Sequence, residues 1–162
     1  MSRSKASTSE VRVELGAPKR GWVMVIIRIG SDEIQCFASY IVDSLTDFVY
    51  AALELMELRP PRPVVLFEEP TAIRVSLVGD GDRVDVRITH HPDLAAAGSD
   101  RLGTVSLSGT VGRVALAGAI WSALRRLEAA VDERTESEWR RPFPTKELAQ
   151  LGKRLTQRNA RP

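Results

Sequence analysis

Hydrophobic and polar residues alternate along this chain with two different periods, and the periods divide it into strands and helices. Alternation with period 2 is typical of a half-buried strand, and apolar residues spaced three and four apart are typical of an amphipathic helix. Before the first helix, the pattern predicts strands over residues 11–15, 22–29 and 33–41. The second of these is apolar on both faces up to Arg28, which indicates a central strand.

The first helix is predicted from three features: a capping residue at its start, apolar residues at helical spacing, and a proline-rich segment at its end. Ser44 and Asp47 place a hydroxyl at the cap and a carboxylate three residues later. An apolar stripe about three turns long follows. The segment Arg59-Pro-Pro-Arg-Pro63 ends it, because proline cannot continue the hydrogen-bond ladder.

A β-hairpin gives the clearest local signal. The alternating segments 72–78 and 83–89 flank Gly79-Asp-Gly-Asp82, and Asp80-Gly81 is a favoured pair for a type I′ turn. With these two residues as the loop, Arg74 lies opposite Arg87 on one face. The other face is then apolar and carries Ile73, Val75, Leu77, Val84, Val86 and Ile88.

The remaining segments are one strand before the hairpin, one after it, and two late helices. Residues 64–67 predict a short strand. A polar loop over residues 90–103 leads to a strand over 104–110 with Val105 and Leu107 facing inward. A long helix is expected from Gly112 to near Arg140, followed after a proline break by a short one over 146–157 that Thr145 caps.

The element order βββ-α-ββββ-αα predicts an α+β fold. Consecutive hairpins without βαβ alternation favour one antiparallel sheet of about six to seven strands with the helices on one face, and a split into two half-sheets is the alternative. Residues 1–9 are expected to be a disordered leader, residues 10–141 a single domain, and residues 142–162 a basic C-terminal helix or tail.

The net charge of +2 hides an uneven distribution. Residues 1–20 carry +3 and residues 140–162 carry +6, whereas residues 21–139 carry −7. Basic ends can attract nucleic acid, or they can fold back on the acidic body. The chain has no apolar run near the ~20 residues needed to cross a bilayer and no secretory leader, so we expect a soluble cytoplasmic protein.

Motifs of known chemistry are missing from the sequence. His90 and His91 are adjacent, so on a strand they would point to opposite faces and could not chelate one ion together, and at a strand end before Pro92 they are expected to be exposed loop residues. Cys36 is the single cysteine, which excludes an intramolecular disulfide, and its apolar strand predicts an inert thiol. We therefore expect no catalytic residue, no metal site and no cofactor.

The polar face of the predicted hairpin is the first candidate binding surface. Arginines beside hydroxyl groups on a flat sheet can bind a carboxylate, a phosphate or an acidic partner. The alternative interpretation is a solvated face with weak salt bridges. The residues of this candidate surface are Arg74, Arg83, Arg87, Asp85, Thr104, Ser106 and Ser108.

The C-terminal segment is the second candidate. Basic residues interleaved with aromatic ones can stack on bases and contact phosphates. The alternative is that the aromatic side chains pin this segment to the body of the protein. The residues concerned are Trp139, Arg140, Arg141 and Phe143.

Two stretches together carry a resemblance to known proteins. Phe67-Glu-Glu-Pro70 precedes the Gly79-Asp-Gly-Asp82 hairpin, and a late helix ends in Trp139-Arg-Arg-Pro-Phe-Pro144. This pattern resembles small uncharacterised bacterial α+β domains over about residues 20–155. The resemblance implies no established activity and no catalytic residue.

The combined pattern predicts a non-enzymatic interaction module, of immunity- or antitoxin-like kind, that binds a protein partner through the polar sheet face. One alternative is a nucleic-acid-associated protein that uses its basic ends. The other is a binder of small anions, or an enzyme, that uses the arginines of the sheet.

Overall fold

The computed structural model describes residues 7–160, which fold into two antiparallel sheets and four α-helices. The first sheet contains β1 (Val11–Leu15), β2 (Trp22–Ile29) and β3 (Asp32–Ser39). The second contains β4 (Val64–Phe67), β5 (Ala72–Asp80), β6 (Arg83–His91) and β7 (Thr104–Gly112). The helices are α1 (Ser44–Met56), α2 (Arg113–Ala130), α3 (Glu133–Trp139) and α4 (Thr145–Asn159), and a 3₁₀ turn covers Ala96–Gly98.

The α+β class is confirmed, and the expected single sheet is divided into two. The strand orders are β1-β2-β3 and β4-β5-β6-β7, so each sheet is a meander of consecutive antiparallel strands. The chain crosses between them through α1. Strands β3 and β4 lie near each other without pairing, which leaves the two sheets separate. Strand β2 is central in its sheet, as its two apolar faces predict.

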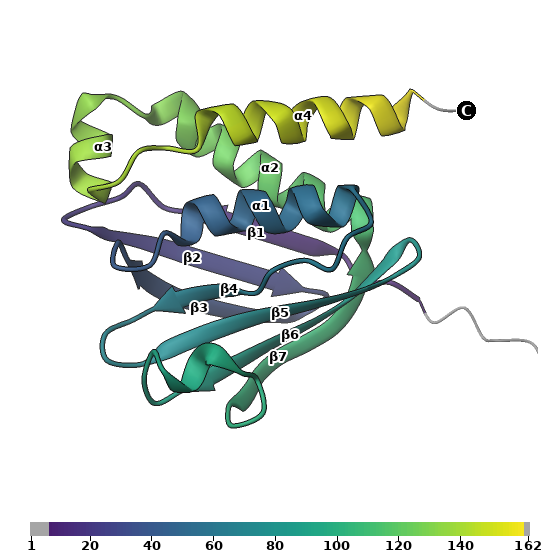
Figure 1. Ribbon diagram of the computed structural model, residues 1–162, viewed down its shortest axis with the longest axis horizontal. Coiled ribbons are helices and arrows are strands. Elements are labelled where there is room, and N and C mark those ends of the chain that lie inside the picture. Colours follow the sequence, from purple (N-terminus) through teal and green to yellow (C-terminus); the bar gives the residue numbers. More distant parts are fainter. Residues whose placement is uncertain (1–6, 161–162) are drawn as a thin grey trace, which may run out of the picture.

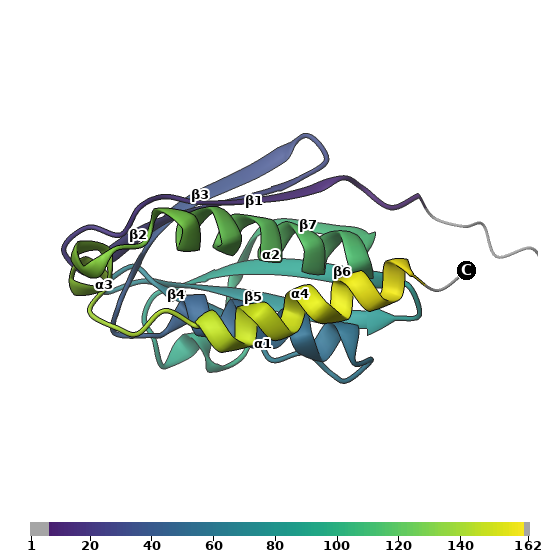
Figure 2. The ribbon, with the colours of Figure 1, turned by 90° about the horizontal axis from the view of Figure 1, so that it is seen from above.

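The helices gather on one side of the sheets (Figure 1). Helix α2 packs on β1 and α1 packs on β4, while α4 packs on α1 and α2 and forms the outermost layer. Seen from above, α2 and α4 run along the length of the molecule and α3 lies at one end (Figure 2). None of the helices within residues 7–160 has the length and apolar character that crossing a bilayer requires.

The core lies between the inner faces of the two sheets and helices α1 and α2. Alternate residues of β2, from Val23 to Ile29, are buried, as are Val75 and Leu77 of β5. At one point the sheets approach closely, since a Cβ on Gly109 of β7 would lie 2.7 Å from Cγ2 of Ile29. Only glycine fits there without a local shift.

The hairpin has its buried face as predicted and a different register. The loop is Gly81-Asp82, because Asp80 pairs with Arg83. Gly81 has φ +60, whereas Asp82 has no positive φ, which fits a type II′ turn with glycine at its first central position. Every cross-strand pair is therefore displaced by two residues from the prediction. Arg74 lies opposite Thr89, and Arg87 lies opposite Ser76.

The last strand differs from its predicted pattern because of a bulge. Leu107 pairs with Ile88 and is buried, but Val105 pairs with Thr89, so Ser106 is an extra residue at that point. The bulge turns Val105 outward, where it is 44% exposed instead of facing the core.

The long helix predicted to reach Arg140 is broken into α2 and α3. Val131 has extended dihedral angles, and the carboxylate of Asp132 then accepts a hydrogen bond from the Thr135 backbone N–H at 2.8 Å. This cap starts a new helix, which the continuous polar pattern did not reveal. Helix α1 is likewise capped by Asp43 and not by Ser44, through the Thr46 N–H at 3.4 Å.

Two smaller differences from expectation concern the start of helix α4 and the N-terminal residues. Helix α4 begins with Thr145 itself, after Pro144, and has no side-chain cap. The leader predicted over residues 1–9 falls mostly on residues 1–6, which lie outside the described residues. Ser9 is described, and its backbone N–H donates to the Thr110 carbonyl at 2.9 Å beside β7.

A buried arginine joins the hairpin to the end of α1. Arg113, the first residue of α2, is 5% exposed. Its Nε donates to the Gly81 carbonyl at 2.6 Å, and a terminal nitrogen donates to the Leu55 carbonyl at 3.0 Å. A cation at the carboxyl end of a helix also interacts favourably with the helix dipole. Arg113 thus links the hairpin loop, the end of α1 and the start of α2.

Candidate functional site

The outer face of the second sheet contains most of the residues predicted for the first candidate surface. Asp85 and Arg87 of β6 are exposed there, and so is Ser108, which pairs with Arg87 from β7. Thr104 and Ser106 are also exposed, farther along β7 and near the bulge. The predicted division between a buried face and an open polar face is present.

Two arginines of that prediction, Arg74 and Arg83, are only partly accessible on this face. Arg74 donates from Nε to the Ser76 hydroxyl at 3.0 Å and from a terminal nitrogen to the Ala97 carbonyl at 3.0 Å. It thereby fastens the 3₁₀ turn to β5. Arg83 is half-buried, and its Nε has no hydrogen-bond partner among the described residues. The predicted opposition of Arg74 and Arg87 is absent because of the register.

The open part of this face is a shallow depression of about 340 Å³. The Thr110 hydroxyl donates to the Asp85 carboxylate at 2.6 Å, which orients that carboxylate. Two apolar side chains accompany the polar ones, Val78 at 64% exposed and Val105 at 44% exposed. We call this surface the sheet face and define it by Ser76, Val78, Asp85, Arg87, Val105 and Ser108.

The residues of the second candidate hold the C-terminal segment against the body. Trp139 is 2% exposed, so its indole is not accessible for stacking on a base. Arg141 donates to the backbone carbonyls of Tyr40 and Ile41, the latter at 2.8 Å. The Arg140 guanidinium lies 5.1 Å from the Tyr40 ring centre, and Phe143 packs on the core. These contacts fit the pinning interpretation of this segment.

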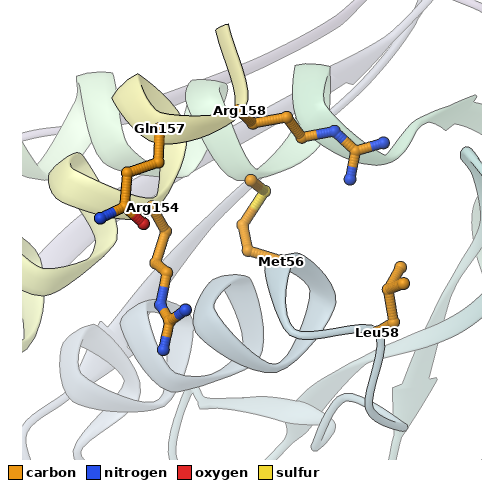
Figure 3. A pocket seen from close by; sticks show the side chains of 5 residues that line it. All are labelled: Met56, Leu58, Arg154, Gln157 and Arg158. Atoms are coloured by element: carbon orange, nitrogen blue, oxygen red, sulfur yellow. The ribbon is translucent and has the colours of Figure 1, made fainter. Parts of the chain in front are cut away.

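A groove with a volume of about 500 Å³ lies between α1 and α4, in a region that the sequence did not single out. Figure 3 shows its lining, with Met56 between the side chains of Arg154 and Arg158. Leu58 lies at the edge of the groove, and Gln157 completes the lining. The spacing of Arg154 and Arg158, four residues apart on a helix, was a signal available in the sequence.

A buried carboxylate next to this region is paired with an arginine. Glu54 of α1 accepts hydrogen bonds from the Arg62 side chain at 2.7 and 2.9 Å and from its backbone N–H at 2.6 Å. Burial alone would raise the pKa of Glu54, but the hydrogen bonds and charge of Arg62 outweigh it and lower that pKa. Asp47 lies 3.7 Å from Arg62, and burial raises its pKa.

The buried histidine and cysteine are closed to substrates. His91 ends β6, contrary to its expected place in an exposed loop, and is fully buried; its Nε2 lies 2.8 Å from the Thr89 hydroxyl, which is buried too. Cys36 is 3% exposed, and burial, together with the charge of Glu68, raises its pKa to about 12. Within residues 7–160 no three His, Cys, Asp or Glu side chains gather as a metal site would require.

Comparison of the chain with protein-family models, with curated proteins and with solved structures finds no significant match.

Proposed function

We propose that this protein is a protein-interaction module that binds its partner through the sheet face. The supporting observation is that exposed apolar side chains lie among charged and hydroxyl groups on one rigid sheet. Val78 pairs with Asp85 and Val105 pairs with Thr89, so the two exposed valines lie at either end of a row that contains Asp85, Arg87 and Ser108. Protein interfaces combine apolar and polar contacts of this kind.

The shape of the sheet face favours a protein over a small molecule. Pockets for small molecules are concave and bury most of the ligand. The depression beside Arg87 is shallow and lies on a strand surface, whose backbone is fixed by pairing on both sides of β6. A flat, pre-ordered surface can bind a partner with little loss of conformational entropy.

Arg87 and Val78 are the residues whose replacement tests the proposal. The tagged chain is used to capture partners from a lysate of the source cells, and a captured protein is then purified and titrated. We expect Arg87→Glu and Val78→Asp each to weaken its binding roughly tenfold or more, because each introduces an unpaired charge into the interface. Both residues are on the surface, so both variants should fold.

The control is Arg126→Glu, which makes the same charge change at an exposed position of α2. Its dissociation constant should stay within about twofold of wild type, because exposed charges away from an interface are largely screened. A partner that binds both sheet-face variants as tightly as wild type would contradict the proposal. Capture of nucleic acid alone, with no protein surviving nuclease treatment, would contradict it as well.

A further inference from the structure

Leu58, at the edge of the α1–α4 groove, combines the backbone conformation of a helix end with an exposed apolar side chain. Its φ is +57, a region that side chains larger than glycine rarely adopt. The Leu58 N–H donates to the Leu55 carbonyl at 3.2 Å and the Arg59 N–H donates to the Glu54 carbonyl at 2.9 Å, so this φ belongs to a Schellman motif that ends α1. The side chain itself is 67% exposed and leaves apolar surface at the edge of the groove.

The groove beside Leu58 has a positive charge and an aliphatic floor. Arg154 is 3.5 Å from the Glu57 carboxylate, and that carboxylate also accepts from Arg59 at 2.6 Å. Within the described residues, no carboxylate lies within 4 Å of Arg158. The two arginine side chains diverge on either side of Met56 (Figure 3). A ligand in the groove would therefore meet cations at both ends and an apolar side chain between them.

The outward face of α4 extends this positive charge. The exposed charged residues Lys146, Lys153, Arg154 and Arg158 are all basic. Glu147 is the one acidic residue of the helix, and it is half-buried, 3.4 Å from the Tyr50 hydroxyl, which donates to it. An anionic partner would thus approach α4 without meeting an exposed carboxylate of that helix.

We infer that the α1–α4 groove binds an acidic polypeptide segment that carries an aliphatic side chain between two carboxylates. In an extended peptide, residues i, i+2 and i+4 face the same side at about 6.8 Å spacing. The two carboxylates would then contact Arg154 and Arg158, and the central side chain would pack on Met56 and Leu58. Guanidinium–carboxylate contacts are among the stronger hydrogen bonds in proteins.

The lining favours a peptide over the other anions that a basic groove could attract. Nucleic-acid strands are bound by aromatic platforms on which bases stack, whereas this groove is lined by Met56, Leu58 and polar side chains. A small molecule would leave much of its surface uncovered, because the groove is open along one side. A peptide can continue along the helix and bury more surface.

The experiment uses a fluorescein-labelled peptide containing Glu-Gly-Leu-Gly-Glu in a serine background. Its binding is measured by fluorescence anisotropy, and its position by ¹H–¹⁵N chemical-shift changes in the full chain. Two matched peptides replace the leucine with serine, or both glutamates with glutamines. We expect shift changes to cluster at residues 56–58 and 154–158, and both matched peptides to bind roughly tenfold more weakly.

Three variants separate the groove from general attraction to basic charge. The double variant Arg154→Ala, Arg158→Ala should weaken binding about tenfold or more, since it removes both carboxylate contacts. Arg126→Ala removes a charge from an exposed position of α2, outside the groove lining and the basic face of α4, so its affinity should stay within about twofold.

Leu58→Gly is the most informative change, because glycine adopts a positive φ without strain. The variant should unfold at the same temperature as wild type or higher, and it should bind the peptide several-fold more weakly. Equal binding by wild type, Leu58→Gly and the double arginine variant would overturn the proposal. So would tighter binding of a single-stranded oligonucleotide that gives the same pattern of chemical-shift changes.

Discussion

Glu54 of α1 couples a single protonation to the stability of the fold. Its carboxylate is 6% exposed and accepts three hydrogen bonds from Arg62, a residue just beyond the end of α1. The Arg62 guanidinium also lies 4.5 Å from the Tyr50 ring centre. This contact ties the proline-rich segment after α1 back onto the helix.

We expect Glu54→Gln to destabilise the protein by about 2 kcal/mol at pH 7, the usual range for hydrogen bonds to a charged group. The folded pKa of Glu54 is lowered, so its contribution is fully present above the unfolded value of about 4.3 and is lost as pH falls through the folded pKa. Asp47, whose pKa is raised mainly by burial, changes stability in the opposite direction; the burial is the same in the variant, and only the smaller contribution of the Glu54 charge differs.

Chemical denaturation of both proteins at several pH values measures this difference. The gap in unfolding free energy between wild type and Glu54→Gln should narrow as pH falls below about 4, because a protonated glutamate resembles glutamine. If the difference in unfolding free energy does not change with pH, the charge of the Glu54 carboxylate contributes nothing to stability and only the shape of the side chain does.

The hairpin of β5 and β6 shows what local pattern can and cannot determine. The tetrapeptide Gly79-Asp-Gly-Asp82 is compatible with two different two-residue loops. Gly81 is the second central residue of a type I′ turn if the loop is Asp80-Gly81, and the first central residue of a type II′ turn if the loop is Gly81-Asp82. The two registers differ by two residues, which leaves each side chain on the same face. The buried set was therefore predicted correctly, while the neighbours of Arg74 and Arg87 were not.

Features that depend on contacts between distant parts of the chain could not be predicted from the local sequence pattern. The division into two sheets depends on whether β3 pairs with β4 across α1, and both strands read as ordinary strands either way. The groove joins Leu58 to α4, almost a hundred residues later. Nothing in the local pattern at Leu58 indicates a positive φ. The residue types on the outer face of β6, by contrast, follow from simple alternation.

Among the contacts between secondary-structure elements, those of Arg113 can be tested by one substitution, because this residue links the hairpin loop, α1 and α2. Replacing it with leucine leaves the carbonyls of Gly81 and Leu55 without their donor in a buried setting. We expect Arg113→Leu to lower the free energy of unfolding by about 3 kcal/mol and to speed amide exchange in the hairpin.

Arg126→Leu is the matched control for that variant, since Arg126 lies on the same helix and is exposed. It should change stability by less than about 0.5 kcal/mol. If the two leucine variants unfold at the same denaturant concentration, the carbonyl contacts of Arg113 do not stabilise the junction.

At the scale of the whole molecule, the sheet face lies on β5, β6 and β7, whereas the groove lies between α1 and α4. Helix α4 forms the outermost helical layer, and β5, β6 and β7 lie on the other side of α1 from it (Figure 1). The two surfaces share no residue. Two sites without shared contacts are expected to bind independently, because neither ligand alters the residues that hold the other.

We therefore predict that a protein bound at the sheet face and an acidic peptide bound in the groove occupy the molecule together. The dissociation constant of the captured partner should change less than about twofold when the peptide saturates the groove, as expected for sites without coupling free energy. Arg87→Glu should weaken only the partner, and the double variant of Arg154 and Arg158 only the peptide. A partner displaced by the peptide would instead show that its own acidic segment occupies the groove, and one surface would then account for both interactions.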